Sequence, residues 1–220
     1  VMPKVADASG IQFRLLNRSR GPAVRGPRTQ SERKLYKKYM KECLISHCNL
    51  SIFYDPVVKF IFNENEIIGV VLNSGKELRA KKIILTTGTF LNGVIHIGSE
   101  MKPGGRHGED PTKGLSEQLK KFNLNIARLK TGTPPRLDGR TINFENLEEQ
   151  KADDSPYFFS VDTKKINAKQ VSCFMTYTND EVHKIIEKNL NRSAMYSGNI
   201  KSVGPRYCPS IEDKIVKFKD

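Results

Sequence analysis

The chain has 220 residues, of which 37% are hydrophobic and 28% are charged, and this composition excludes an intrinsically disordered tail. Its apolar runs, such as Val70–Leu72 and Ile83–Leu85, fall far short of the roughly 20 residues that a membrane-spanning helix needs, so we expect no membrane association. The net charge of +13 and the pI of about 9.6 favour phosphate-bearing partners such as nucleic acid or a dinucleotide, although a surface of solvated lysines would give the same totals.

The chain begins without an apolar signal core, so we do not expect secretion, and the start resembles a truncated one. Arginines then gather around Gly21-Pro22 and Gly26-Pro27, which predict turns rather than a helix. Because the guanidinium fork suits bidentate phosphate recognition, this turn-rich loop is a candidate nucleic-acid or phosphate site, and a solvated linker is the alternative. The candidate residues are Arg14, Arg18, Arg20, Arg25 and Arg28.

A helix near residues 30–46 is predicted by the capping-box pattern Thr29-Gln-Ser-Glu32 and by apolar residues at helical spacing after it. Short runs rich in Ile, Val and Phe follow, separated by turn-forming Asn and Gly residues. They predict a β-meander at about 50–80 and a closing strand, with strands at Leu50–Tyr54, Val57–Phe62, Ile67–Leu72 and Lys82–Thr86.

Two glycine-containing turns are candidate cofactor contacts. The apolar run from Ile83 ends in Thr87-Gly88-Thr89, where small residues would let the backbone approach a cofactor at the end of a parallel strand. Gly104-Gly105-Arg106, with a predicted helix at about 113–122 after Thr112, is suited to cradling a pyrophosphate, and an ordinary surface loop is the alternative.

The pattern changes at about residue 124, which predicts a domain boundary between 1–123 and 124–220. Strands are expected at Asn125–Leu129 and Val171–Tyr177, and an amphipathic helix capped by Asn179 is expected at Glu181–Leu190. The four cysteines, Cys43, Cys48, Cys173 and Cys208, have no C-x-x-C pair and no histidines at zinc spacing. We therefore expect a reducing compartment, no metal site, and a cytoplasmic location, or a mitochondrial one in a eukaryote.

The tail Gly204-Pro-Arg-Tyr-Cys208-Pro-Ser-Ile-Glu-Asp-Lys-Ile-Val-Lys-Phe218 is a dense polar run without periodicity, which indicates a site. It resembles the signature of the GidA or MnmG family. Three more segments resemble that family in the same order: Gly10–Asn17 with Gly21–Arg25, Thr87–Leu91, and Leu129–Arg136. The similarity covers essentially the whole chain, which would make it an internal fragment.

The resemblance implies an α/β fold, namely part of a doubly wound FAD-binding domain of the two-dinucleotide type with a β-meander, plus an inserted smaller α/β domain. It implies FAD, NADH as reductant, and methylenetetrahydrofolate as carbon donor for modification of the tRNA wobble uridine at C5. The implied partners are tRNA, the GTPase MnmE and a second copy of the chain. No G-x-G-x-x-G fingerprint is present, so the first βαβ unit is expected before Val1, and we expect the chain alone to be inactive.

Carried over by position, the resemblance places Val57 and Thr112 at the flavin nucleotide, beside the candidates Gly88, Thr89, Gly104, Gly105 and Arg106. It assigns one continuous segment to NAD. That segment comprises Gly204, Pro205, Arg206, Tyr207, Cys208, Pro209, Ser210, Ile211, Glu212, Asp213, Lys214, Ile215, Val216, Lys217 and Phe218.

The family match also makes Cys208 a catalytic candidate. A thiolate suits nucleophilic addition at C6 of uracil, which eases bond formation at C5, and Arg206 is close enough in sequence to stabilise it. A packed or substrate-positioning cysteine is the alternative. For the whole chain, two other functions stay open: a folate- and FAD-dependent tRNA uracil methyltransferase, and a non-catalytic basic RNA-binding module.

Overall fold

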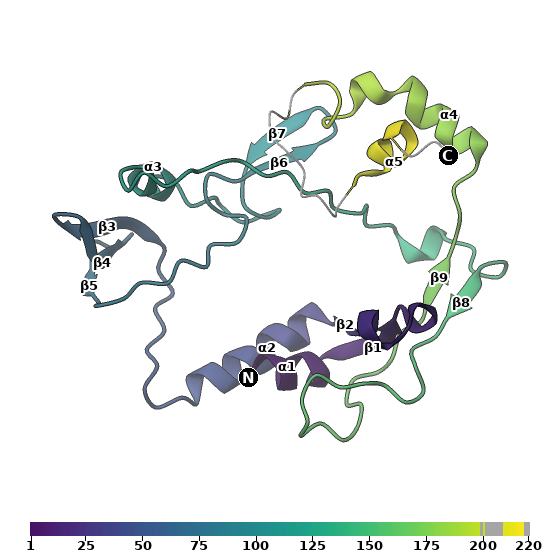
Figure 1. Cartoon of the computed structure of the whole chain (residues 1–220), viewed down its shortest axis with the longest axis horizontal. Helices are drawn as coiled ribbons and strands as arrows, with labels where there is room; N and C mark the ends of the chain where they lie inside the picture. The colour runs from purple at the N-terminus through teal and green to yellow at the C-terminus, as the bar shows by residue number, and fades with distance from the viewer. Residues whose placement is uncertain (199, 201–208, 218–220) are drawn as a thin grey trace. The chain divides into compact units, whose positions relative to one another are not determined.

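A computed structural model of the chain describes residues 1–198, 200 and 209–217 (Figure 1). The chain divides into two compact units, each built from two stretches of sequence. Unit 1 contains Val1–Phe53 and Leu137–Tyr177, and unit 2 contains Tyr54–Arg136 and Thr178–Asp220. Each unit therefore contains residues from both sides of the domain boundary predicted at residue 124. That boundary refers to the domains of the full-length protein, and it stays a prediction.

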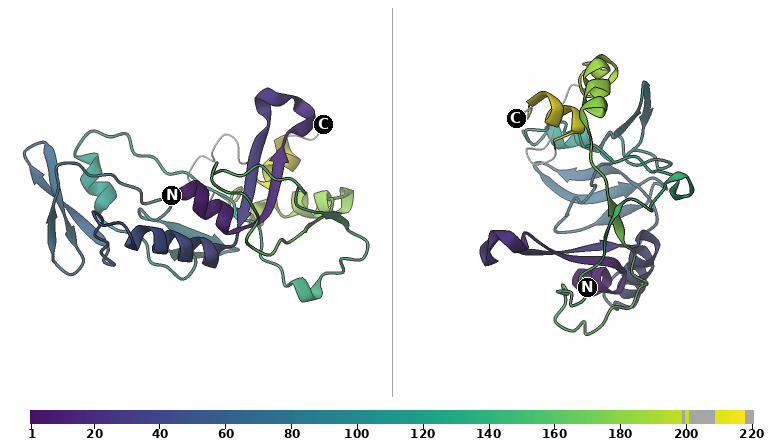
Figure 2. Two further views of the ribbon diagram at one scale, coloured as in Figure 1. Left: turned by 90° about the horizontal axis from the view of Figure 1, so that it is seen from below. Right: turned by 90° about the vertical axis from the view of Figure 1, so that its right-hand side faces the viewer.

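Unit 1 is built around a long antiparallel hairpin between two helices. Its helices are α1 (Met2–Ala8) and α2 (Arg33–Ile45), its hairpin strands are β1 (Gly10–Leu16) and β2 (Gly26–Ser31), and its second stretch adds β8 (Glu148–Gln150) and β9 (Cys173–Met175). Short 3-10 turns lie at Arg18–Arg20, Pro22–Val24 and Gly139–Thr141. Both views of Figure 2 show the β1–β2 hairpin projecting as a ribbon beyond the helices of the same unit.

Unit 2 contains a three-stranded antiparallel meander, a hairpin and three short helices. The meander is β3 (Val57–Asn63), β4 (Glu66–Leu72) and β5 (Glu77–Arg79), and the hairpin is β6 (Val94–Ile97) with β7 (Glu100–Pro103). The helices are α3 (Leu115–Lys120), α4 (Asp180–Lys188) and α5 (Ile211–Lys217), with a 3-10 turn at Leu190–Arg192. The meander predicted at 50–80 is therefore confirmed at 57–79.

Three predicted strands are wrong, because the residues at 50–54, 82–86 and 125–129 form no strand in the structure. A strand exists only when a neighbour satisfies its backbone hydrogen bonds, and these segments find no ladder partner within the described ranges. Ile84 illustrates the result, since it is apolar yet 86% exposed. Among the described residues, the strands pair only antiparallel, and a parallel contact occurs only as an isolated bridge between Leu91 and Thr112. The doubly wound sheet and the inserted domain stay predictions.

Helix α2 confirms the predicted helix but not its cap. Glu32 is itself the N-cap, and its carboxylate accepts a hydrogen bond from the backbone N–H of Leu35 at 2.7 Å. Thr29, the predicted cap, lies on β2 instead. The cap of α4 is confirmed, because the Asn179 side chain accepts from the backbone N–H of Val182. The α4 prediction holds to within two residues, whereas α3 is shorter than expected.

The buried apolar core of each unit is small. In unit 1, Val5 and Phe13 are almost fully buried, and Phe13 packs edge-on against Phe158 with ring centroids 5.5 Å apart. Buried polar groups carry part of the packing as well. The Asp7 carboxylate, 1% exposed, accepts hydrogen bonds from the backbone of Phe159 and Ser160 and from the Thr163 hydroxyl, at 2.8–2.9 Å.

We therefore predict that Asp7→Ala destabilises unit 1. The substitution removes the acceptor of three hydrogen bonds to a charged group, and a single bond of this kind is worth about 1.5–3 kcal/mol. The free energy of unfolding should fall by at least that amount in urea denaturation followed by circular dichroism. Asp162→Ala is the control, because the Asp162 side chain pairs with exposed Lys4 alone among the described residues and is itself 64% exposed. Equal effects of the two substitutions would contradict the anchoring role of Asp7.

Candidate functional site

The candidate arginines lie on the hairpin of unit 1, which we call the arginine hairpin (residues 10–31), with its tip at residues 17–25. Contrary to the predicted loop, Arg14 and Arg28 stand on strands and oppose each other directly in the β1–β2 register. Arg18 and Arg20 lie in the first 3-10 turn of the tip, and Arg25 follows the second. The structure thus brings all five together on one ribbon, which the turn signals alone did not predict.

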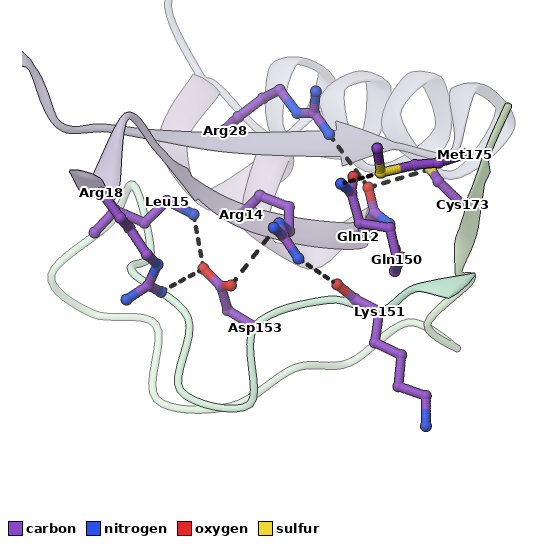
Figure 3. A network of polar contacts seen from close by, with 10 residues as sticks. All are labelled: Gln12, Arg14, Leu15, Arg18, Arg28, Gln150, Lys151, Asp153, Cys173 and Met175. Carbon is purple, nitrogen blue, oxygen red and sulfur yellow. Dashed lines mark hydrogen bonds and ion pairs between the residues drawn. The ribbon is translucent and has the colours of Figure 1, made fainter. Parts of the chain in front are cut away.

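A buried glutamine organises the base of this hairpin (Figure 3). Gln12 is 1% exposed, and its Nε2 donates to the backbone carbonyl of Gln150 at 3.0 Å. Its Oε1 accepts from the Arg28 guanidinium at 3.3 Å and from the Cys173 thiol at 3.4 Å. The Arg28 and Cys173 side chains are therefore used inside the fold, where they complete the hydrogen bonds of a buried amide.

Asp153 holds the other edge of the hairpin (Figure 3). One of its oxygens accepts from the backbone N–H of Leu15 at 2.7 Å and from Arg18 at 2.8 Å, while Arg14 lies 3.9 Å from the other oxygen. Arg14 also donates to the backbone carbonyl of Lys151. Burial raises the pKa of Asp153, but the hydrogen bonds from Arg18 and Leu15 outweigh burial and lower it overall. Asp153 is therefore a charged anchor, although no local pattern in the sequence indicates this role.

The predicted flavin residues after Val57 come together in unit 2 as a glycine cluster, comprising Gly88, Thr89, Gly104, Gly105, Arg106 and Thr112. The Thr89 hydroxyl donates to the Gly105 carbonyl at 2.7 Å. The backbone of Thr112 donates to the Phe90 carbonyl at 2.8 Å and accepts from Asn92 at 2.9 Å. Three stretches of the chain are thus fixed against one another by short hydrogen bonds.

Close packing explains why position 105 in this cluster is a glycine. A Cβ atom at Gly105 would lie 2.4 Å from the Phe90 ring and 2.7 Å from the Phe90 Cα, distances that no real side chain tolerates. Arg106 remains about half exposed, with its guanidinium 4.0 Å from the Glu109 carboxylate. An open cavity of about 410 Å³ lies beside the cluster, lined by Asn92, Gly93, Val94, Pro103, Pro111, Lys113, Gly114 and Glu117.

Val57 is connected to the cluster through helix α3. Val57 is half-buried at the start of β3. The Gln118 side chain accepts from the backbone N–H of Phe60 at 2.9 Å and donates to the Val58 carbonyl at 3.4 Å. Because α3 begins three residues after Thr112, this contact joins the strand of Val57 to the loop of Thr112 within one unit.

The predicted NAD segment is described only in part, because residues 204–208 and 218, including Cys208, lie outside the described residues. In the described part, Ser210 and Asp213 form a capping box at the start of α5: Asp213 N–H donates to Ser210 Oγ at 3.1 Å, and Ser210 N–H and Oγ each lie 3.3 Å from Asp213 Oδ2. The Asp213 carboxylate also accepts from the Tyr196 hydroxyl at 2.9 Å and from Lys217 at 2.6 Å.

Glu212 is anchored to the stretch that also contains Tyr196, since its carboxylate accepts a hydrogen bond from the Ser193 hydroxyl at 2.6 Å. Three residues of the predicted NAD segment, Ser210, Glu212 and Asp213, are therefore hydrogen-bonded within the fold. Lys214 is exposed, with no side-chain partner among the described residues. The anchoring residues Ser193 and Tyr196 were missed, because nothing near them in sequence indicates the contact.

In the part of the chain that the structure describes, no helix is long and apolar enough to cross a membrane. Over the same residues, no three His, Cys, Asp or Glu side chains group in a way that would hold a metal ion.

We predict a pH signature for the α5 anchor. The hydrogen bond from Lys217 is the largest of the effects that lower the pKa of Asp213, from 3.8 to about 2. The ionised carboxylate therefore stabilises the fold above its unfolded pKa, and this contribution is lost as the pH falls through the folded pKa. The stability difference between wild type and Asp213→Asn should be constant between about pH 5 and 8 and shrink between about pH 4 and 2.

Urea denaturation at a series of pH values measures this difference. Asp180→Asn is the control, because Asp180 lies in the first turn of α4 and forms no side-chain hydrogen bond within the described ranges. A gap for Asp213→Asn that persists unchanged at pH 2 would show that its charge does not hold α5.

Comparison with known proteins places this chain in a family. The family model described as glucose inhibited division protein A (GidA) matches residues 1–220. Two similar proteins are named tRNA uridine 5-carboxymethylaminomethyl modification enzyme MnmG: that of Thermodesulfovibrio yellowstonii is 54% identical over 220 residues, and that of Aquifex aeolicus is 49% identical over 226. Both alignments cover the whole chain but only 35% and 37% of the respective relatives.

The fold agrees with solved structures. Aquifex aeolicus GidA in crystal form I superposes with a TM-score of 0.87 at 49% identity, and form II with 0.85 at 46%; each match covers 100% of this chain and 38% or 36% of that protein. The chain thus spans little more than a third of the length of the relatives that it matches, and its mixed α/β structure is that of the corresponding part of GidA. The chain belongs to the GidA family.

Proposed function

We propose that the full-length protein containing this chain is an FAD- and NADH-dependent enzyme that adds a carboxymethylaminomethyl group to C5 of the tRNA wobble uridine. The observation that carries this proposal is the identity of about half the residues, over the whole chain, with two enzymes named for this modification. The proposal includes methylenetetrahydrofolate as carbon donor, the GTPase MnmE as partner, a homodimer, and a cytoplasmic or mitochondrial location.

The glycine cluster supports the flavin part of the proposal. Gly88 has φ +56°, and a Cβ built on it meets nothing within 4 Å, so its backbone faces open space that cofactor atoms are free to approach. The half-exposed Arg106 is available to a pyrophosphate. Val57, Gly88, Thr89, Gly104, Gly105, Arg106 and Thr112 would hold the nucleotide part of the cofactor. When bound, FAD supplies two-electron redox chemistry that NADH drives.

Cys208 is the proposed nucleophile. Its thiolate would bond to C6 of the uracil, and the C5–C6 electron pair would then make C5 nucleophilic toward the one-carbon unit. Loss of the C5 proton and release of the thiolate from C6 would restore the ring and the free cysteine. If the thiol only positions the substrate, Cys208→Ser should retain much of the activity.

The names of the relatives do not favour the two alternatives, a tRNA uracil methyltransferase and a non-catalytic RNA-binding module. The first experiment separates them from the proposal. The full-length protein should be yellow, and anaerobic NADH should bleach its flavin absorption band. A colourless protein that takes up no added FAD would overturn the proposal and favour the RNA-binding module, and a flavoprotein that only methylates uracil would favour the methyltransferase.

Gly105→Ala tests whether FAD binds at the glycine cluster. The added methyl group collides with Phe90 in a tightly hydrogen-bonded cluster, and overpacking of this kind costs about 1–3 kcal/mol. The affinity of the full-length protein for FAD should fall by about tenfold or more, as measured by flavin fluorescence on titration. Gly139→Ala is the matched control, because nothing lies within 4 Å of its added methyl group. Unchanged affinity in Gly105→Ala would place the flavin elsewhere.

A further inference from the structure

The arginine hairpin carries a charge excess that the fold itself does not neutralise. Residues 10–31 contain five arginines, no lysine and no acidic residue, although the whole chain contains 24 lysines and 13 arginines. A general enrichment in basic residues would have placed lysines here as well. The bias toward arginine instead indicates selection for the planar, bidentate donor.

The register of the hairpin makes this excess costly. Arg14 and Arg28 are a directly opposed cross-strand pair, and like charges in that position destabilise a sheet. Within the described part of the chain, Asp153 is the one carboxylate that pairs with any of the five arginines. Among the described residues, four of the five positive charges therefore have no carboxylate of their own, on a ribbon that projects from its unit (Figure 2).

The contacts divide the arginines into two groups. Arg28 donates to the buried Gln12, Arg14 donates to the Lys151 carbonyl, and Arg25 donates twice to the Arg18 carbonyl, at 3.1 and 3.2 Å. These three brace the hairpin. Arg18 and Arg20 are the remaining two, and both are exposed.

Arg18 and Arg20 are presented by a pre-formed tip. The Asn17 side chain donates to the Val24 carbonyl at 3.0 Å, and together with the two bonds from Arg25 this closes the tip across its two 3-10 turns. Arg18 is 55% exposed and shares Asp153 through one hydrogen bond, while Arg20 has no side-chain hydrogen bond or ion pair among the described residues. A rigid tip loses little conformational entropy when it binds a ligand.

We infer that this tip is a contact surface for RNA phosphates, with Arg18 and Arg20 as the contacting residues and Arg25 and Arg28 as positioning residues. The inference rests on the proposed function for its partner, tRNA. Phosphate oxygens accept bidentate hydrogen bonds from guanidinium groups and supply most of the salt-dependent affinity of such complexes. The carboxylate of Asp153 holds Arg18 through Nη2, and no other Arg18 side-chain nitrogen has a hydrogen bond among the described residues, so the rest of its fork is open to a phosphate.

The test is the salt dependence of tRNA binding by the full-length protein. Fluorescence anisotropy with labelled tRNA at several NaCl concentrations gives the slope of log K against log salt. In the double variant Arg18→Gln, Arg20→Gln the magnitude of this slope should fall by about 2, roughly one for each phosphate that the variant no longer binds. Flavin content and the circular dichroism spectrum should stay close to wild type, because Arg20 has no side-chain hydrogen bond among the described residues and Asp153 keeps its bond from the Leu15 backbone when Arg18 is replaced.

The matched control is Arg79→Gln, Arg140→Gln, which also removes two exposed arginines. Each of these pairs with a carboxylate two residues away, Glu77 and Asp138, so the control should leave the slope unchanged. A wild-type slope in the hairpin variant would overturn this inference and leave the flavin proposal intact. If the hairpin variant keeps the wild-type slope but no longer captures an acidic protein that the wild type captures, the tip binds that protein and the inference about RNA is wrong. Absence of tRNA binding in the wild type would overturn the proposed function itself.

Discussion

Hydrogen bonds to three polar side chains, Asp7, Gln12 and Asp153, hold unit 1 together. Apart from the bond between Gln12 and Arg28 within the hairpin, they join residues 135 to 161 positions apart in the chain, across a stretch that belongs to the other unit. Because the buried apolar side chains of unit 1 are few, these polar contacts fix where its second stretch lies on the hairpin. Directional contacts of this kind specify one arrangement, since a buried donor without its acceptor costs its full desolvation penalty.

That constraint also explains how the hairpin tolerates its arginines. Asp153 accepts from the β1 backbone at Leu15, and Gln12, which lies on β1, donates to the Gln150 carbonyl. The ribbon therefore does not depend on favourable pairing between its own charged side chains. Unit 2 uses the same means on a smaller scale. Backbone and hydroxyl hydrogen bonds fix the glycine cluster, and the capping box of Ser210 and Asp213 fixes α5. In both units the groups proposed to meet ligands are carried on elements that other residues hold rigid.

Local features of the fold could be predicted from the sequence, and distant ones could not. The turns at Asn63–Asn65 and Asn73–Gly75, the strands beside them and the Asn179 cap were found, because each depends on neighbours within a few residues. The strand expected at 82–86 was wrong, because its apolar pattern says nothing about whether a partner strand is present. Among site residues, the arginines were recognisable from composition. Asp153 and Tyr196 were not, because their importance comes from partners across the fold.

The division of unit 1 into two stretches has a consequence for its synthesis. The hairpin contacts are local and can form as soon as residue 31 has left the ribosome, but the donors that satisfy Asp7, from Phe159 to Thr163, come about 130 residues after residue 31. At about 5 to 20 residues per second this interval is about 6 to 26 seconds. During that time the nascent chain presents a bare arginine ribbon without its single carboxylate, Asp153, so the segment is at its most cationic before the unit that carries it has closed.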